Sequence, residues 1–264
     1  MKTLKKGSVG DDVKTLQKIL GVTVDGCFGS QTEAAVKKWQ SAHGLVADGI
    51  VGPKTWATMS EQTIDIPNVV YDPLNVHITK ADSREIKYIA IHYTAGISSR
   101  KGSARAVKSV FITHAVSADF AVDDAEAVQF NPDLKNYYCW AVGDPKNKYS
   151  KGGTLYSVAK NRNTVSIEIC SNLVKGASVR EANHRGWYFT DAELQNAAKL
   201  TKALMKKFDI PIDRVVRHYD VSGKVCPGVV GWNNEIIYTI AGKQTNERSD
   251  STAWERFKKL IAEI

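Results

Sequence analysis

The N-terminal part of the chain combines helical apolar stripes with glycine-containing turns. Apolar residues recur at intervals of three and four over 13–20 and again over 35–39, which predicts two amphipathic helices. The segments VDGCFGSQTEAAV (24–36) and ADGIVGPKTWATM (47–59) align at a fixed offset, and each contains a D-G turn, a further glycine and a helix start. Such a repeat indicates one small unit used twice. Residues 1–60 are therefore predicted to form an all-α domain of three helices.

A polar stretch with two prolines and no helical periodicity, residues 61–83, is predicted to be the linker and the entry segment to a second domain over 84–264. In the second domain, residues 87–94 (KYIAIHYT) and 163–170 (NTVSIEIC) are β-branched and alternate between two faces, which predicts strands. A capping box at 190–193 (TDAE) opens an apolar stripe at helical spacing. Strands that alternate with helices predict an α/β domain with a central mixed β-sheet flanked by helices.

Composition and charge narrow the class of protein. The 264 residues are 43% hydrophobic and 24% charged, as in ordinary globular chains, and no run approaches the roughly 20 apolar residues of a membrane span. The first residues, MKTLKKGSVGDD, lack the apolar core of a secretory signal, so we expect synthesis in the cytoplasm and action elsewhere only after release. The net charge of +8 favours an anionic cell wall or membrane surface as partner, or serves solubility alone. Its scattered distribution argues against nucleic acid.

The four cysteines lie far apart and include no C-x-x-C pair. In a chain made in the cytoplasm they are expected to stay reduced. Cys27 and Cys170 are expected to be small buried apolar residues.

Three residues have the chemistry of a metal site. His92 lies near the end of the first predicted strand, His218 ends the β-branched run VVRH, and Cys226 follows after a glycine-containing loop. A lone histidine in such a place is more often hydrogen-bonded structure than a ligand. Three ligands of mixed nitrogen and sulfur type that leave one position open are, however, the pattern of a catalytic zinc, although the same set would bind other borderline metals.

The sequence around these residues is similar to that of a known family. Over about 84–230 the chain resembles the zinc-dependent N-acetylmuramoyl-L-alanine amidases found in phage endolysins, and the motifs that carry the resemblance are IAIHYTAG, NTVSIEIC and RHYDVSGKVCPG. The resemblance implies one Zn²⁺ per chain held by His92, His218 and Cys226. It also implies that Glu168 is the catalytic acid–base and that Lys224 polarises the substrate.

The N-terminal repeat has a resemblance of its own. The segments GSVGDDVKTLQ (7–17), VDGCFGSQT (24–32) and GLVADGIVGPKTW (44–56) resemble the peptidoglycan-binding module that accompanies many wall hydrolases. The same glycines and tryptophans also serve to build a compact helical bundle, so the residues that contact ligand are not identified by the pattern.

The predicted catalytic residues suit hydrolysis of an amide. Zinc lowers the pKa of bound water and polarises a carbonyl, while a carboxylate moves the proton from water to the leaving amine. Glu168 lies within a strand, where an unpaired carboxylate is costly to bury, so it is either this general base or half of a structural ion pair. Lys224 is either the partner of the tetrahedral oxyanion or a solvated loop lysine. The resemblance favours the catalytic alternative for both.

Other residues near these motifs are candidates for substrate contact. Tyr93 and Thr94 directly follow His92 and are expected either to line the cleft or to pack beside it. Trp140 is expected to stack on a sugar or to fill the core. The chain departs from the family at two positions that often carry histidine, where it has Asp119 and Ala141, so any role of those histidines is lost or passes to Asp119.

These observations predict a peptidoglycan hydrolase of two domains. The module at 1–60 binds bacterial peptidoglycan, and the domain at 84–264 cleaves the bond between N-acetylmuramic acid and L-alanine through zinc-activated water. We expect a monomer, with neither nucleic-acid binding nor stable membrane insertion. The expected setting is a phage or prophage endolysin that lyses bacteria, with a bacterial autolysin as the alternative.

Two rival functions stay open at this point. Relatives of this fold bind peptidoglycan without cutting it, and the resemblance implies that they tend to lack the metal-binding cysteine. The presence of Cys226, Glu168 and Lys224 favours the enzyme. The other rival is a zinc hydrolase that cuts a peptide bond within the stem or the cross-bridge.

Overall fold

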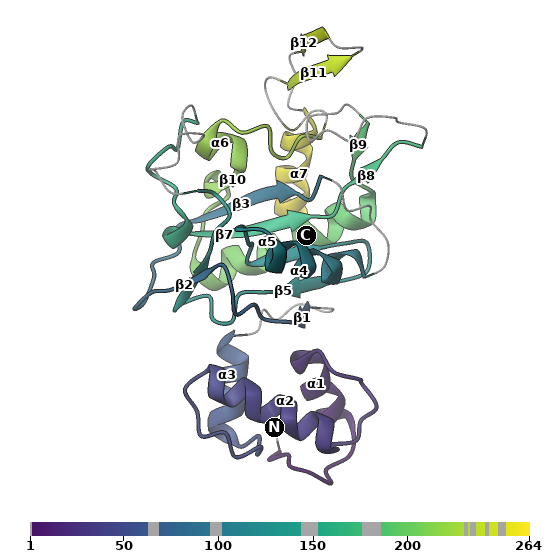
Figure 1. Cartoon of the computed structure of the whole chain (residues 1–264), viewed down its shortest axis with the longest axis vertical. Helices are drawn as coiled ribbons and strands as arrows, with labels where there is room; N and C mark the ends of the chain where they lie inside the picture. The colour runs from purple at the N-terminus through teal and green to yellow at the C-terminus, as the bar shows by residue number, and fades with distance from the viewer. Residues whose placement is uncertain are drawn as a thin grey trace.

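The computed structural model describes residues 2–62, 69–95, 102–143, 153–175, 186–229, 232, 236–240, 243–247 and 252–264. The N-terminal unit contains the three predicted helices, α1 (Asp11–Leu20), α2 (Ser30–Ala42) and α3 (Pro53–Gln62) (Figure 1). Ser30 and Pro53 each begin a helix, as the repeat predicted. The predicted class, a small all-α domain followed by an α/β domain, is confirmed.

The internal repeat is held together by one glutamine in each copy. Gln17 Nε2 donates to Asp25 Oδ1 at 2.7 Å, and Gln17 Oε1 accepts the backbone N–H of Gly26 at 2.8 Å. Gln40 makes the equivalent bonds to Asp48 at 2.9 Å and to Gly49 at 2.9 Å. Both glutamines are buried, so each D-G turn is fixed from inside the unit.

A six-stranded mixed sheet forms the centre of the second domain, in the order β1-β5-β4-β7-β3-β10. The neighbours β4, β7, β3 and β10 are parallel, whereas β5 runs antiparallel to β4. The strands are β1 (Val69–Tyr71), β3 (Tyr88–Tyr93), β4 (Phe120–Val122), β5 (Ala127–Gln129), β7 (Thr164–Ile169) and β10 (Val215–Arg217). The two predicted strands are thus adjacent central strands, β3 and β7.

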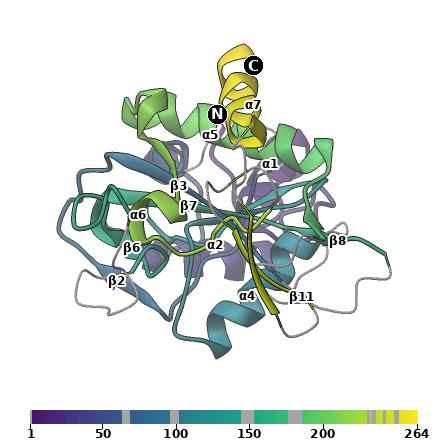
Figure 2. The same ribbon diagram turned by 90° about the horizontal axis from the view of Figure 1, so that it is seen from above.

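Helices cover both faces of this sheet (Figure 2). On one face lie α5 (Asp191–Phe208) and α7 (Thr252–Glu263), whose apolar sides join the main core with the β-branched residues of β3 and β7. On the other face α4 (Ser103–Thr113) packs through Val107 and Phe111. The predicted capping box is present, since Thr190 Oγ1 accepts the N–H of Glu193 and Glu193 accepts that of Thr190.

The remaining described elements are short. The strand pairs are β2 (Ile78–Lys80) with β6 (Tyr137–Cys139), β8 (Asn172–Leu173) with β9 (Trp187–Tyr188), and β11 (Ile236–Ile240) with β12 (Lys243–Glu247). The helical turns are η1 (Asn161–Asn163), η2 (Ile212–Arg214) and α6 (His218–Ser222). Among the described residues, no helix is both long and apolar enough to cross a membrane.

The segment expected to link the domains takes part in both. From Val69 it forms edge strand β1 of the sheet, while the Tyr71 ring packs into the core of the N-terminal unit. The Tyr71 hydroxyl donates to Pro132 O at 2.9 Å, and His43 Nε2 lies 2.8 Å from the same oxygen. At Gly21, where φ is 65°, an added Cβ would lie 2.7 Å from Tyr71 O, so the close approach of α1 to β1 depends on glycine.

All four cysteines are unpaired in the structure. Cys170 is buried, but the expectation of burial is wrong for Cys27, which is exposed. Cys27 forms an isolated bridge with Val9 at the edge of the helical unit, and Val9 is itself 75% exposed.

Candidate active site

The centre of the candidate site is built by two neighbouring strands. His92 of β3 and Glu168 of β7 are direct register partners, so their side chains leave the sheet side by side. His92 Nδ1 lies 3.9 Å from Glu168 Oε1. Parallel pairing across the whole of β7 sets this register.

The next strand along the sheet brings the other two predicted ligands. Strand β10 pairs with β3 and ends at Arg217, and His218 is the first residue of α6 rather than the last of the strand. The loop after α6 returns to it, because the N–H of Tyr219 donates to Cys226 O at 2.9 Å. Cys226 Sγ thereby lies 3.7 Å from His92 Nδ1, and the two histidine rings are 4.6 Å apart between centroids.

These three side chains have the arrangement of a metal site. The potential ligand atoms of His92, His218 and Cys226 all lie within 4.8 Å of one another, and each residue is at most 6% exposed. His92 Nε2 and His218 Nδ1 are buried without a hydrogen-bond partner. Buried polar atoms are rarely left in this state, so the donor set fits a cation, and two nitrogens with one sulfur suit zinc.

The electrostatics of the cluster also fit a cation. Burial, then the neighbouring His218 and the charge of Lys224, hold the pKa of His92 well below its usual value. Burial and Lys224 lower the pKa of His218 to about 3, so both rings are neutral and able to bind metal. Burial raises the pKa of the Cys226 thiol to about 12. The charge of Glu168 also raises it, whereas the charge of Lys224 lowers it. A thiol in this position ionises readily only beside a positive ion.

The two predicted catalytic residues lie beside the cluster. Burial raises the pKa of Glu168 to about 8, although the charge of Lys224 acts to lower it, and Glu168 Oε2 is buried without a partner. Lys224 is exposed and follows Gly223, which ends α6 with φ at 72°. Its charge acts on His92, His218 and Glu168, and it lines the same cavity as they do.

A cavity of about 400 Å³ opens over these residues. The cluster, Glu168 and Lys224 line it, and so do the predicted contact residues Tyr93, Thr94 and Trp140. The Tyr93 ring nevertheless packs edge-on against Trp187 in the core, and the Trp140 indole donates to Thr79 Oγ1 at 2.9 Å. Trp140 is 39% exposed, so part of its ring faces the solvent.

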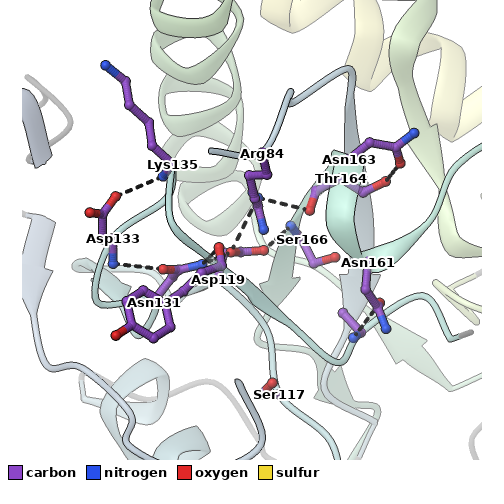
Figure 3. Close-up of polar contacts among 12 residues, drawn as sticks. Arg84, Ser117, Asp119, Asn131, Asp133, Lys135, Asn161, Asn163, Thr164 and Ser166 are labelled. Atoms are coloured by element: carbon purple, nitrogen blue, oxygen red, sulfur yellow. Dashed lines mark hydrogen bonds and ion pairs between the residues drawn. The ribbon is translucent and has the colours of Figure 1, made fainter. Parts of the chain in front are cut away.

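The two positions where the family often has histidine differ in location. Ala141 lines the cavity, whereas Asp119 does not and is only 1% exposed. The Asp119 carboxylate instead accepts hydrogen bonds from Ser166 and Asn131 in the interior (Figure 3). Burial raises the pKa of Asp119, while the Arg84 charge opposes this. His114, at the end of α4, is exposed and does not line the cavity.

Sequence reasoning missed the apolar part of the cavity lining. It comes mainly from α4 and the segment after it, through Val107, Val110, Phe111 and Val116. Its only signal is apolar residues at helical spacing, which equally indicate a core-facing helix. The glutamines of the repeat were also missed, although Gln17 and Gln40 occupy equivalent positions in its two copies.

Two family models match the chain, one in each of its two parts. The N-acetylmuramoyl-L-alanine amidase family matches residues 82–229, and a putative peptidoglycan binding domain matches residues 9–59. N-acetylmuramoyl-L-alanine amidase CwlA of Bacillus sp is 37% identical over 111 residues, which are 42% of this chain and 35% of the relative. N-acetylmuramoyl-L-alanine amidase CwlH of Bacillus subtilis (strain 168) is 32% identical over 172 residues, 63% of this chain and 58% of the relative.

A solved structure covers most of the chain. The catalytic domain of XlyA superimposes with a TM-score of 0.47 and 25% identity, over 74% of this chain and 99% of that one. The curated relatives are longer than the matched region, and the chain spans 35% to 58% of the length of the two amidases.

Proposed function

Because the chain belongs to the N-acetylmuramoyl-L-alanine amidase family, we propose that it hydrolyses the amide bond between N-acetylmuramic acid and the L-alanine of the peptidoglycan stem peptide. The observation that carries the proposal is the buried cluster of His92, His218 and Cys226 with Glu168 beside it, all lining one cavity. An amide is a poor electrophile, and this arrangement offers both a cation site and a proton acceptor within one small volume.

In this proposal His92, His218 and Cys226 hold one Zn²⁺ per chain. Zinc supplies a Lewis acid there, which polarises the amide carbonyl and makes water more acidic. Glu168 takes the proton from the attacking water and passes it to the leaving nitrogen. Burial raises the pKa of Glu168 in the metal-free site, and a cation beside the carboxyl acts in the opposite direction and favours the carboxylate that accepts the proton. The ammonium group of Lys224 stabilises the negative oxygen of the tetrahedral intermediate.

The rest of the cavity holds the substrate. The apolar residues of α4 line the same cavity as the catalytic residues and suit the lactyl and alanyl methyl groups beside the scissile bond. Trp140, exposed at the rim, is positioned to stack on a sugar. The N-terminal unit binds the same polymer, which keeps the catalytic domain close to its substrate.

The biological setting is part of the proposal. We infer a phage or prophage endolysin, made in the host cytoplasm and acting as a monomer on the wall after release. A bacterial autolysin is the alternative. Both settings require the same reaction.

The products decide between the proposed function and its rivals. Purified peptidoglycan is digested with the wild-type protein and with Glu168→Gln, and the products are analysed by mass spectrometry and by labelling of new amino groups. The proposal predicts free L-alanine amino termini and glycan strands with unsubstituted lactyl groups, from the wild type alone. New amino groups on any other residue indicate a peptidase, and binding without release of any product indicates a recognition protein.

A further inference from the structure

Strand β7 lacks a neighbouring strand along part of its length. It pairs with β3 over all of Thr164–Ile169, but with β4 only over Ile167–Ile169. Within the described residues, no strand adjoins 164–166 on the β4 side. Buried backbone N–H and C=O groups need hydrogen-bond partners, so side chains have to supply them here.

Two charged side chains occupy the place of the missing strand (Figure 3). Asp119, the residue just before β4, accepts the N–H of Ser166 on Oδ2 at 2.8 Å, and Arg84 Nη2 donates to Thr164 O at 3.2 Å. Arg84 Nη2 also lies 3.8 Å from Asp119 Oδ1. The pair therefore binds one N–H and one C=O of β7, as an adjacent strand would.

The same pair is also hydrogen-bonded to other parts of the domain. Asn131 Nδ2 donates to Asp119 Oδ1 at 2.6 Å and to Tyr137 O at 2.9 Å. The backbone N–H of Arg84 donates to Lys135 O at 2.8 Å. The side chains of Arg84 and Asp119 are 0% and 1% exposed, so solvent does not compete for these bonds.

The Arg84–Asp119 pair lies close to the predicted catalytic carboxylate of Glu168. Ser166 and Glu168 lie on the same face of β7, about 7 Å apart along the strand. Glu168 is in register with His92 on one side and Ala121 on the other. A change in the path of β7 at Ser166 therefore shifts the Glu168 carboxyl relative to His92.

We propose that Asp119, paired with Arg84, is a positioning residue that holds Glu168 in place through the backbone of β7. The inference rests on the proposed amidase function. The carboxylate itself is required, because both Asp119 oxygens face donors. An asparagine could still accept from Ser166, but its amide nitrogen would meet the Nδ2 donor of Asn131, and the buried charge of Arg84 would lose its partner.

The test compares Asp119→Asn with a matched control, Glu193→Gln. The buried Glu193 carboxylate also accepts a backbone N–H, from Thr190, and a side-chain amide, from Asn172, but it does so at the start of α5. For both variants kcat and KM are measured on a soluble N-acetylmuramoyl peptide, at a temperature where each is folded by circular dichroism. Zinc content and amide hydrogen exchange are measured on the same preparations.

For Asp119→Asn we expect kcat to fall about 10-fold or more with KM nearly unchanged, since misplacing a catalytic group by about 1 Å can cost 100-fold. Zinc content should stay at that of the wild type, the Ser166 amide should exchange faster, and Glu193→Gln should keep its kcat. The proposal is overturned if Asp119→Asn keeps its kcat, or if both variants lose it equally.

A second variant and a second readout cover the cases in which the first comparison gives no answer. If Asp119→Asn does not fold, Arg84→Lys retains the charge but not the reach of the guanidinium to Thr164, and it should lower kcat at constant KM; an unchanged kcat would refute the proposal. If the wild type itself releases no product, the proposed function fails instead. In that case amide hydrogen exchange still tests the Arg84–Asp119 pair. The Ser166 amide should be protected from exchange in the wild type and lose this protection in the variants.

Discussion

Glu168→Gln should stabilise the metal-free protein at neutral and alkaline pH, although it removes the catalytic carboxylate. The Glu168 side chain is 18% exposed, its Oε2 atom has no partner, and burial raises its pKa from 4.5 to about 8. A carboxyl with a raised folded-state pKa binds its proton more tightly in the folded than in the unfolded chain. Below about pH 4.5 Glu168 therefore does not reduce the free energy of unfolding. The reduction grows as the pH rises from there and is complete above about pH 8.

The size of the effect follows from these two values. The interval from 4.5 to about 8 corresponds to about 5 kcal/mol at alkaline pH, since one pKa unit is worth about 1.36 kcal/mol. At pH 7 about 3 kcal/mol of this is already present, and residual exposure of the carboxyl makes both values upper limits. Glutamine has the same shape without the charge, so it removes the penalty.

Urea unfolding in the presence of EDTA, followed by tryptophan fluorescence at pH 4, 7 and 9, measures this difference. We expect wild type and Glu168→Gln to be equally stable at pH 4, and the variant to be the more stable at pH 7 and 9. Glu193→Gln is the control of opposite sign, because its carboxylate is hydrogen-bonded in the fold and its loss should destabilise at pH 7. A Glu168→Gln variant no more stable than wild type at pH 9 would refute the reasoning.

Three other substitutions test the role of Lys224, the packing of Tyr71 and the hydrogen bond of Gln40. Lys224→Met should lower kcat by about 100-fold without changing the zinc content, because it removes only the partner of the oxyanion; steady-state kinetics and metal analysis check this. Tyr71→Ala should lower the free energy of unfolding by about 3 to 5 kcal/mol, because its ring is part of the core of the N-terminal unit; urea unfolding measures it, and Tyr71→Phe isolates the share of the hydroxyl. Gln40→Ala should cost about 1 to 3 kcal/mol, because the buried N–H of Gly49 loses its acceptor; a thermal midpoint unchanged by the substitution would contradict it.

The sequence was sufficient where local patterns determine structure. Alternation in β3 and β7 predicted which side chains share a face, and the capping box at Thr190 predicted the start of α5. The predicted ligands His92 and His218 come together because parallel strands end at the same edge of the sheet. Glu168 joins them because β7 is the neighbour of β3, which periodicity alone does not reveal.

The features that the sequence did not predict depend on contacts between distant segments. The Arg84–Asp119 pair, with Asn131, joins three parts of the chain through single polar side chains, which leave no periodic signal. Strand β1 is only three residues long, so the segment that contains it resembled a linker. Burial of Tyr71 in the other domain follows from the docking of the two units, for which no local pattern exists.

The most direct test of the account is the metal content of purified wild type, Cys226→Ser and Glu168→Gln, measured beside amidase activity on the same preparations. We expect about one zinc per chain and release of stem peptides for the wild type, loss of both for Cys226→Ser, and loss of activity alone for Glu168→Gln, because Glu168 lies beside the ligands without being one. A wild type that cleaves the amide without zinc, or a Cys226→Ser variant that keeps both metal and activity, would contradict the assignment of this site.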